Sequence, residues 1–110
     1  MDVAVQDHGP ATVVTVTGEI DLATASQLST KLDGVDLSRP VVVDLSGVTF
    51  IDSSGLNALV QLRQKMQATP TPSRLGVVVS RPSTRRIFEV TGLSEVFALY
   101  DTATEALAAP

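Results

Sequence analysis

The segment FIDSSGLNAL, residues 50–59, places one carboxylate and two hydroxyls directly before an apolar helical pattern. Serine and aspartate are ordinary caps at such a place, because the first turn of a helix leaves backbone N–H groups without helical partners. The alternative is that one serine is a reactive group, either a nucleophile or the acceptor of a modification. The rest of the chain has to decide between these uses.

Nucleophilic catalysis needs a base beside the serine, usually a histidine that a carboxylate orients. The only histidine is His8, in the expected turn between the first two strands, where nothing directs it toward Ser53. The G-x-S-x-G elbow of many hydrolases is also absent, because Ile51 stands two residues before Ser53. With one histidine and no cysteine, the usual zinc ligands are missing as well. We therefore predict no catalytic residue and no metal ligand, and an esterase is only a minor alternative.

Phosphate-binding loops are not found either. The sequence contains neither G-x-x-x-x-G-K-[ST] nor G-x-G-x-x-G. Asp52 would also repel a nucleotide phosphate from the N-terminus of the helix that follows it. A weak nucleotide or small-anion site stays open as an alternative, because helix N-termini attract anions in general. No cofactor is predicted.

The remaining possibility is a serine that accepts a phosphoryl group. At a helix N-terminus this group could accept the unpaired N–H donors, and the helix dipole favours its charge, so the fold should survive the modification. Phosphorylation adds roughly −1.5 to −2 charges at pH 7. Next to Asp52, that charge would repel a partner that docks there. Ser53 or Ser54 could therefore act as a binding switch.

Composition limits the functions that the chain can have. Its 110 residues, 44% hydrophobic and 18% charged, suit one globular domain over residues 1–110. No apolar run approaches the roughly 18 residues that span a bilayer, and the acidic start lacks the basic region of a secretory signal. The absence of cysteine excludes disulfides. We therefore expect a cytoplasmic protein without a membrane segment.

The net charge of −4 argues against nucleic-acid binding, which requires a basic surface that releases counterions from phosphates. Arg85 and Arg86 are the only adjacent basic pair, and a helix with two solvated arginines explains them more simply. No direct contact with nucleic acid is predicted.

The first half of the chain contains both kinds of hydrophobic period. Residues 3–5 and 12–18 alternate apolar with polar side chains around the turn DHGP, which predicts an antiparallel hairpin with one solvated face. From Asp21 the period changes to every three or four residues, at positions 22, 25, 28, 32 and 35. This predicts an amphipathic helix that Asp21 caps and Gly34 ends. VVVDL at 41–45 is a short apolar run typical of a strand buried on both faces.

The second half repeats the alternation of strand and helix. A second helix follows Asp52, residues 68–73 (ATPTPS) form a loop, and LGVVV is the next buried strand. Pro82 begins a third helix that stops at Gly92, VFALY is the last strand, and a final short helix opens at Thr102. We therefore predict a single α/β domain with a mixed, mostly parallel sheet, an N-terminal antiparallel hairpin and about four helices.

Parallel topology would bring the strand-to-helix connections to one end of the sheet. These are residues 18–21, 46–54 and 80–82. In open α/β sheets, ligands and partners dock in the crevice at this end. Ser53 would lie in that region.

Three blocks of the sequence, in order, resemble one known family. VVVDLSGVTFIDSSGLNAL (41–59) resembles the central segment of STAS domains, particularly the bacterial anti-anti-sigma factors, also called anti-sigma factor antagonists. TGEIDLATA (17–25) is similar to the family's first strand-to-helix loop, and RRIFEVTGLSEVFALYDTATEAL (85–107) to its C-terminal segment. Together the blocks cover nearly the whole chain.

The resemblance implies a regulatory protein that is not an enzyme. Members of the family bind an anti-sigma factor, which is a serine kinase of the GHKL type, and so release a sigma factor. The kinase phosphorylates the serine directly after the motif's aspartate, which here is Ser53, and a PP2C-type phosphatase reverses the modification. Carried over, the partner-binding residues are Asp21, Asp52, Ser53, Ser54 and Gly55. No oligomeric state is implied.

The sequence departs from the family pattern at Asn57, often a small or apolar residue, and at ATPTPSR (68–74), where a glycine-containing turn is common. Neither departure touches the motif around Ser53. Two other roles stay open: a STAS subunit of a transport or stress-sensing complex, and a sensor of nucleotides or small anions.

Overall fold

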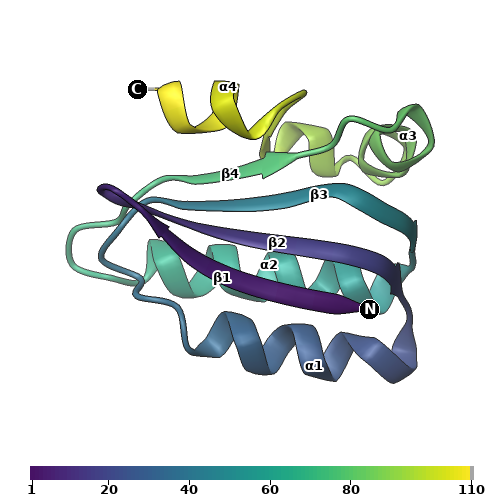
Figure 1. The fold of residues 1–110 in the computed structure, drawn as a ribbon, viewed down its shortest axis with the longest axis horizontal. Coiled ribbons are helices and arrows are strands. Elements are labelled where there is room, and N and C mark those ends of the chain that lie inside the picture. Colours follow the sequence, from purple (N-terminus) through teal and green to yellow (C-terminus); the bar gives the residue numbers. More distant parts are fainter. Residues whose placement is uncertain (110) are drawn as a thin grey trace.

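The computed structural model describes residues 1–109 and confirms the predicted α/β class and the predicted order of elements (Figure 1). The elements are β1 (Asp2–His8), β2 (Ala11–Ile20), α1 (Leu22–Asp33), β3 (Val41–Ile51), α2 (Ser53–Gln67), β4 (Leu75–Val78), α3 (Pro82–Val90), the 3₁₀ turn η1 (Leu93–Glu95), β5 (Ala98–Tyr100) and α4 (Ala103–Ala108). None of the described helices is long and apolar enough to cross a membrane.

The five strands form one sheet in the order β1-β2-β3-β4-β5. The β1–β2 pair is antiparallel and the other three pairs are parallel, as predicted. Helices α1 and α2 pack against each other below the sheet in Figure 1, whereas α3 and α4 lie above it. Parallel strands thus carry helices on both faces, which is the reason for their apolar sequences.

The main core lies between the sheet and helices α1 and α2. Phe88 of α3 joins this core, is fully buried and packs edge-to-face on Phe97, with ring centroids 6.0 Å apart. A smaller cluster of Val13, Val42, Val78 and Ala106 fills the space under α4. β3 is therefore buried on both faces at its start, as predicted.

The solvated face that we expected for the hairpin is only partly present. Val14 and Val16 face the main core, as the alternation requires, and Thr17 is exposed. However, Val13 on the other face is only 6% exposed, because α4 covers it. The alternation of one strand could not reveal that a helix ninety residues later packs on its polar side.

Strand β3 extends beyond the expected residues 41–45, and two β-bulges interrupt the alternation of buried and exposed residues that would have revealed its full length. Its pairing with β2 shifts by one residue between Thr15 and Thr17 and again between Gly18 and Glu19. The core-facing positions of β3 are consequently 41, 43, 45, 48 and 51, with two steps of three residues. A strict period of two ends after Leu45, so residues 46–51 were wrongly predicted to belong to the connection before α2.

This extension changes which connections meet at the end of the sheet. Ser46 lies within β3, and its carbonyl accepts a hydrogen bond from Arg81 Nε at 3.3 Å. The connection at residues 80–82 therefore lies beside the middle of β3. Parallel pairing directs this connection toward the same end of the sheet as Ser53, as predicted, but β4 is short and its last pairing with β3 is at Asp44, so the connection begins well before the Ser53 junction.

Helix α1 begins after Asp21 and is capped by Gly34, as predicted. Gly34 has φ −87°, an ordinary right-handed conformation, so its position does not require glycine. Leu22 was expected on the buried face but is 81% exposed. It is the first residue of α1, and the buried side of the helix carries Ala25, Leu28 and Leu32 instead.

Candidate functional site

Asp52 connects β3 to α2 and caps the helix. Its Oδ1 accepts hydrogen bonds from the N–H groups of Ser54 (3.0 Å) and Gly55 (3.4 Å), and from the Ser54 hydroxyl. The hydrogen bond from the Ser54 hydroxyl is the largest cause that lowers the pKa of Asp52 below its ordinary value of 3.8. Desolvation opposes it, and the N–H groups of Ser54, Gly55 and Leu22 add smaller lowering effects. The carboxylate at this junction is therefore charged at neutral pH.

The two serines of the motif differ in their environment. Ser54 is partly buried, and its hydroxyl donates to Asp52. Ser53 is the first residue of α2, is exposed, and its hydroxyl makes no hydrogen bond within residues 1–109. Of the two hydroxyls, that of Ser53 is the one accessible to another protein.

Gly55 has a packing role. It is buried, and a Cβ atom there would lie 2.6 Å from Ile20 Cγ2 and 2.8 Å from Ile51 Cγ1. Only glycine lets the first turn of α2 lie this close to the ends of β2 and β3. We predicted Gly55 as a partner-binding residue; because it is buried, it supports the surface without forming part of it.

Asp21 caps the neighbouring helix with a complete capping box. Its Oδ1 accepts from Thr24 N–H at 3.0 Å, and Thr24 Oγ1 accepts from Asp21 N–H at 2.9 Å. The two helix starts are joined, because Asp52 N–H donates to the Ile20 carbonyl at 3.1 Å. We call residues 19–22 and 50–54 the Ser53 end. The structure thus brings Asp21, Asp52, Ser53 and Ser54 together on it.

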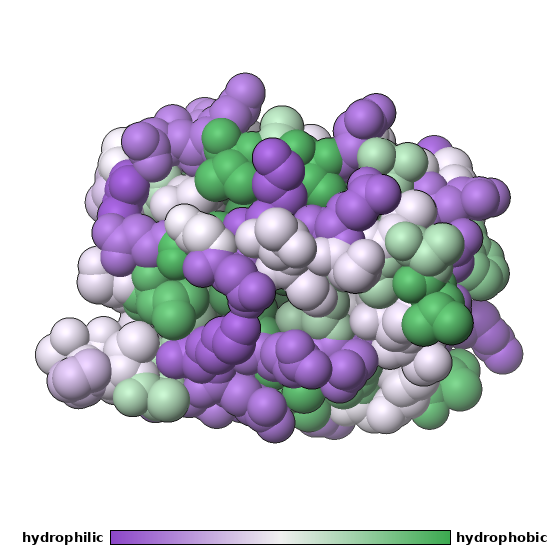
Figure 2. Space-filling model, turned by 90° about the horizontal axis from the view of Figure 1, so that it is seen from below, coloured by the Kyte–Doolittle hydropathy of each residue, from purple (hydrophilic) through white to green (hydrophobic). Residues whose placement is uncertain are grey.

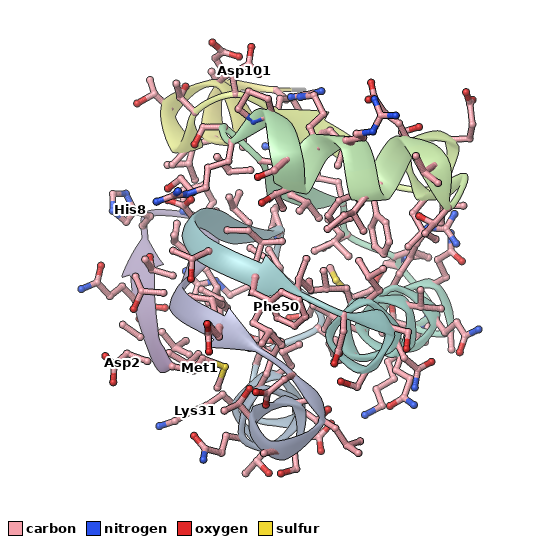
Figure 3. The ribbon with its side chains drawn as sticks, turned by 90° about the vertical axis from the view of Figure 1, so that its right-hand side faces the viewer. Met1, Asp2, His8, Lys31, Phe50 and Asp101 are labelled. Carbon is pink, nitrogen blue, oxygen red and sulfur yellow. The ribbon has the colours of Figure 1, made fainter. Side chains whose placement is uncertain are left out.

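Two residues of the Ser53 end were missed from the sequence. Phe50 is 48% exposed, and Figure 3 shows it in the middle of the face where α1 and α2 are seen end-on. Leu22 is exposed at the start of α1. An aromatic residue two positions before a helix-capping aspartate was the available signal, but its exposure depends on the bulge in β3.

The Asp-x-Ser unit occurs three times with the same geometry. Asp36 Oδ1 accepts from the N–H and hydroxyl of Ser38, at 2.9 and 2.6 Å. Asp44 and Ser46 repeat these contacts at the same distances, at the first bulge of β3. Asp52 and Ser54 form the third unit. In each, the carboxylate satisfies a backbone donor where regular pairing stops.

Nothing in the described part of the chain assembles a catalytic or metal site around Ser53. His8 pairs with Ala11 at the beginning of β2, so it lies at the opposite end of that strand from Ile20 and the Ser53 end. Among residues 1–109, no three His, Cys, Asp or Glu side chains could together hold a metal ion. A cavity of about 200 Å³ lies elsewhere, lined in part by Arg63, Met66 and Phe97.

The face formed by α1 and α2 is largely hydrophilic, with separate hydrophobic patches, as seen from below in Figure 2. The Ser53 end thus offers an exposed hydroxyl, two capping carboxylates and exposed apolar side chains on one surface. Such a surface suits contact with another protein that a charge on Ser53 could prevent.

Comparisons of the sequence and of the structure with known proteins point to one family. The family model for the STAS domain matches residues 2–106. The chain is 36% identical over 107 residues to the anti-sigma-F factor antagonist RsfB of Mycobacterium tuberculosis, covering 96% of this chain and 85% of that protein.

Two solved structures share the fold. An anti-sigma factor antagonist from Mycobacterium paratuberculosis matches with a TM-score of 0.87 and 38% identity, over 96% of this chain and 90% of that one. The phosphorylated form of the Bacillus cell fate determinant SpoIIAA matches with a TM-score of 0.70 over 96% of both chains, and at 20% identity it supports the fold alone. With the family model matching nearly every residue, and with the sheet, helices and Asp-Ser-Ser-Gly junction in the expected order, the chain belongs to the STAS domain family.

Proposed function

We propose that this protein is an anti-sigma factor antagonist whose binding is switched by phosphorylation of Ser53. In its unphosphorylated form it binds an anti-sigma factor and so releases a sigma factor. The names of the relatives at 36% and 38% identity support this function. The observation that carries the switch is the exposed Ser53 hydroxyl, beside a Ser54 hydroxyl that is already engaged by Asp52.

The proposed partners follow from this role. The anti-sigma factor is a serine kinase of the GHKL type, which supplies the ATP, and a PP2C-type phosphatase restores the free hydroxyl. The protein itself catalyses nothing and acts in the cytoplasm, where sigma factors work. It requires no cofactor, and it contacts neither nucleic acid nor membrane.

The geometry of the Ser53 end supports a switch that leaves the fold intact. A phosphoryl group on the first residue of α2 would add its charge at a helix N-terminus, where the dipole is favourable. The same group would stand beside the charged carboxylate of Asp52 and concentrate negative charge on the docking surface. A charged group that loses its water at an interface without a paired charge costs several kcal/mol, and each 1.4 kcal/mol is about tenfold in affinity.

The test is phosphorylation of the purified protein by candidate GHKL-type anti-sigma factors with ATP, followed by mapping of the site and binding assays on both forms. We expect one modification, on Ser53, and binding at least about a hundredfold weaker afterwards. Ser53→Ala should bind constitutively, and Ser53→Asp should weaken binding in part. Ser54→Ala is the matched control and should still be phosphorylated. Modification at another residue, or equal binding by both forms, would contradict the proposal.

A further inference from the structure

The Ser53 end carries two apolar side chains that the packing of this chain leaves in solvent. Leu22 is 81% exposed and Phe50 is 48% exposed. Both lie within two residues of a helix-capping aspartate, Asp21 or Asp52. The other large hydrophobic side chains exposed among the described residues are Val5, Val90 and Val96, and none of them belongs to the Ser53 end.

The backbone turns Phe50 away from the core. Val48 and Ile51 are both buried, so the strand advances three residues between two core-facing positions. The extra residue is Thr49, which has no partner on β2, because Gly18 pairs with Val48 and Glu19 with Phe50. Regular alternation after Val48 would have buried Phe50. Bulges of this kind are common beside functional sites, where they redirect a side chain.

The surroundings of these side chains are acidic. Glu19 is the direct partner of Phe50 on β2. The backbone N–H of Leu22 is one of the groups that lower the pKa of Asp52, so the start of α1 lies next to this carboxylate. Residues 19–22 and 50–54 include no lysine or arginine. A surface that complements this one is apolar where it meets Phe50 and Leu22 and basic around them.

We propose that Phe50 and Leu22 are the apolar anchors by which this protein grips its anti-sigma factor, on an apolar surface of that factor bordered by lysine or arginine. This inference rests on the proposed function and deepens it. A few side chains near the centre of an interface commonly carry most of its binding energy, and phenylalanine is enriched in interface cores. The anchors also make the switch effective, because a phosphoryl group three residues from Phe50 would have to lose water inside an apolar contact.

The test uses the full-length, unphosphorylated protein and each purified anti-sigma factor of its host, with binding measured by calorimetry. For the factor that binds, Phe50→Ser and Leu22→Ser should each weaken binding by about tenfold to a hundredfold. Phe50→Leu should recover most of the affinity. The matched controls are Val5→Ser and Val90→Ser, at sites 45% and 75% exposed, which should change affinity less than about twofold.

The outcomes separate the anchors from the function. If the wild type binds an anti-sigma factor and both serine variants bind equally well, the anchors are refuted while the proposed function stands. If only one of the two serine variants loses affinity, that residue is the anchor, and the anchor role of the other residue is refuted. Equal losses of affinity in the Val5 and Val90 controls would also overturn the proposal, since they would indicate general destabilisation. Thermal unfolding of each variant measures that destabilisation directly. If the wild type binds no anti-sigma factor, both proposals fall.

Discussion

At the scale of single residues, the junction before α2 places two identical hydroxyls in different environments. Ser54 and Asp52 form one capping unit, which leaves the neighbouring Ser53 hydroxyl exposed. Because the cap does not use Ser53, a modification there need not break the contacts that hold the helix start. Structural capping and regulation are therefore compatible within three consecutive residues.

The charge of Asp52 should make stability depend on pH. Because its pKa is lower in the folded protein than the ordinary 3.8, it stabilises the fold above about pH 4, and this contribution disappears as the pH falls through the folded pKa. Asp52→Asn keeps a capping side chain but removes the charge. We expect the urea midpoints of wild type and variant to differ most above pH 4 and to converge toward pH 2.

Asp36 is the matched control for this measurement. It accepts the same two hydrogen bonds from Ser38, and these lower its pKa too, with the hydroxyl of Ser38 as the largest cause. Asp36→Asn should show the same convergence without affecting partner binding, because residue 36 follows the C-terminal end of α1, whereas the Ser53 end adjoins the N-terminus of that helix. Parallel stability curves for wild type and Asp52→Asn down to pH 2 would contradict the assignment.

At the scale of elements, the site depends on the close approach of α2 to two strand ends. Gly55 permits this approach, and the bulges of β3 bring Ile51 inward to meet it. The same bulges turn Phe50 outward. The exposed surface of the Ser53 end is thus a consequence of irregularities in one strand, and the capping of α1 and α2 fixes the two helix starts beside it.

Gly55→Ala should destabilise the protein by about 1–3 kcal/mol, since the added methyl would overlap Ile20 and Ile51 side chains that are themselves buried. Gly34→Ala is the matched control. Gly34 also adjoins a helix, but its φ is −87° and the nearest atom to an added Cβ is 3.6 Å away. This variant should be neutral or stabilised by up to about 1 kcal/mol. Equal effects of the two variants in urea unfolding would refute the packing argument for Gly55.

At the scale of the whole molecule, two clusters of buried side chains hold the sheet between its helices. The larger lies under α1 and α2 and extends to Phe88 and Phe97, and the smaller lies under α4. The Ser53 end is at one edge of this body, so its surface residues can change without emptying either cluster. Stability and binding should therefore be separable by mutation.

Phe88→Ala should cost about 3–5 kcal/mol, because it would leave a cavity at a fully buried aromatic pair. Domains of this size are commonly stable by only about 5–15 kcal/mol, so the urea midpoint should fall steeply. Phe88→Leu fills more of the space than alanine does and should lose clearly less stability than Phe88→Ala. The affinity of the remaining folded protein for its anti-sigma factor should be unchanged; a selective loss of affinity at full stability would contradict this separation.

The sequence alone determined the order of elements, the helix caps and the serine motif. These features are local, since a cap at Asp21 or Asp52 depends on the next three residues, and a helix or strand shows its own hydrophobic period. Local reasoning left Ser53 and Ser54 as equal candidates, and only the family resemblance selected Ser53. That resemblance is carried by contiguous blocks of sequence, and it agreed with the fold.

Tertiary structure decided the rest. The burial of Val13 depends on α4, the exposure of Leu22 on where α1 meets the sheet, and the place of residues 80–82 on how far β3 outruns β4. The direction of Phe50 depends on a bulge, which appears only when β3 is paired with β2. In each case the physical reason is the same: the outcome depends on a partner distant in the chain, which no local pattern contains.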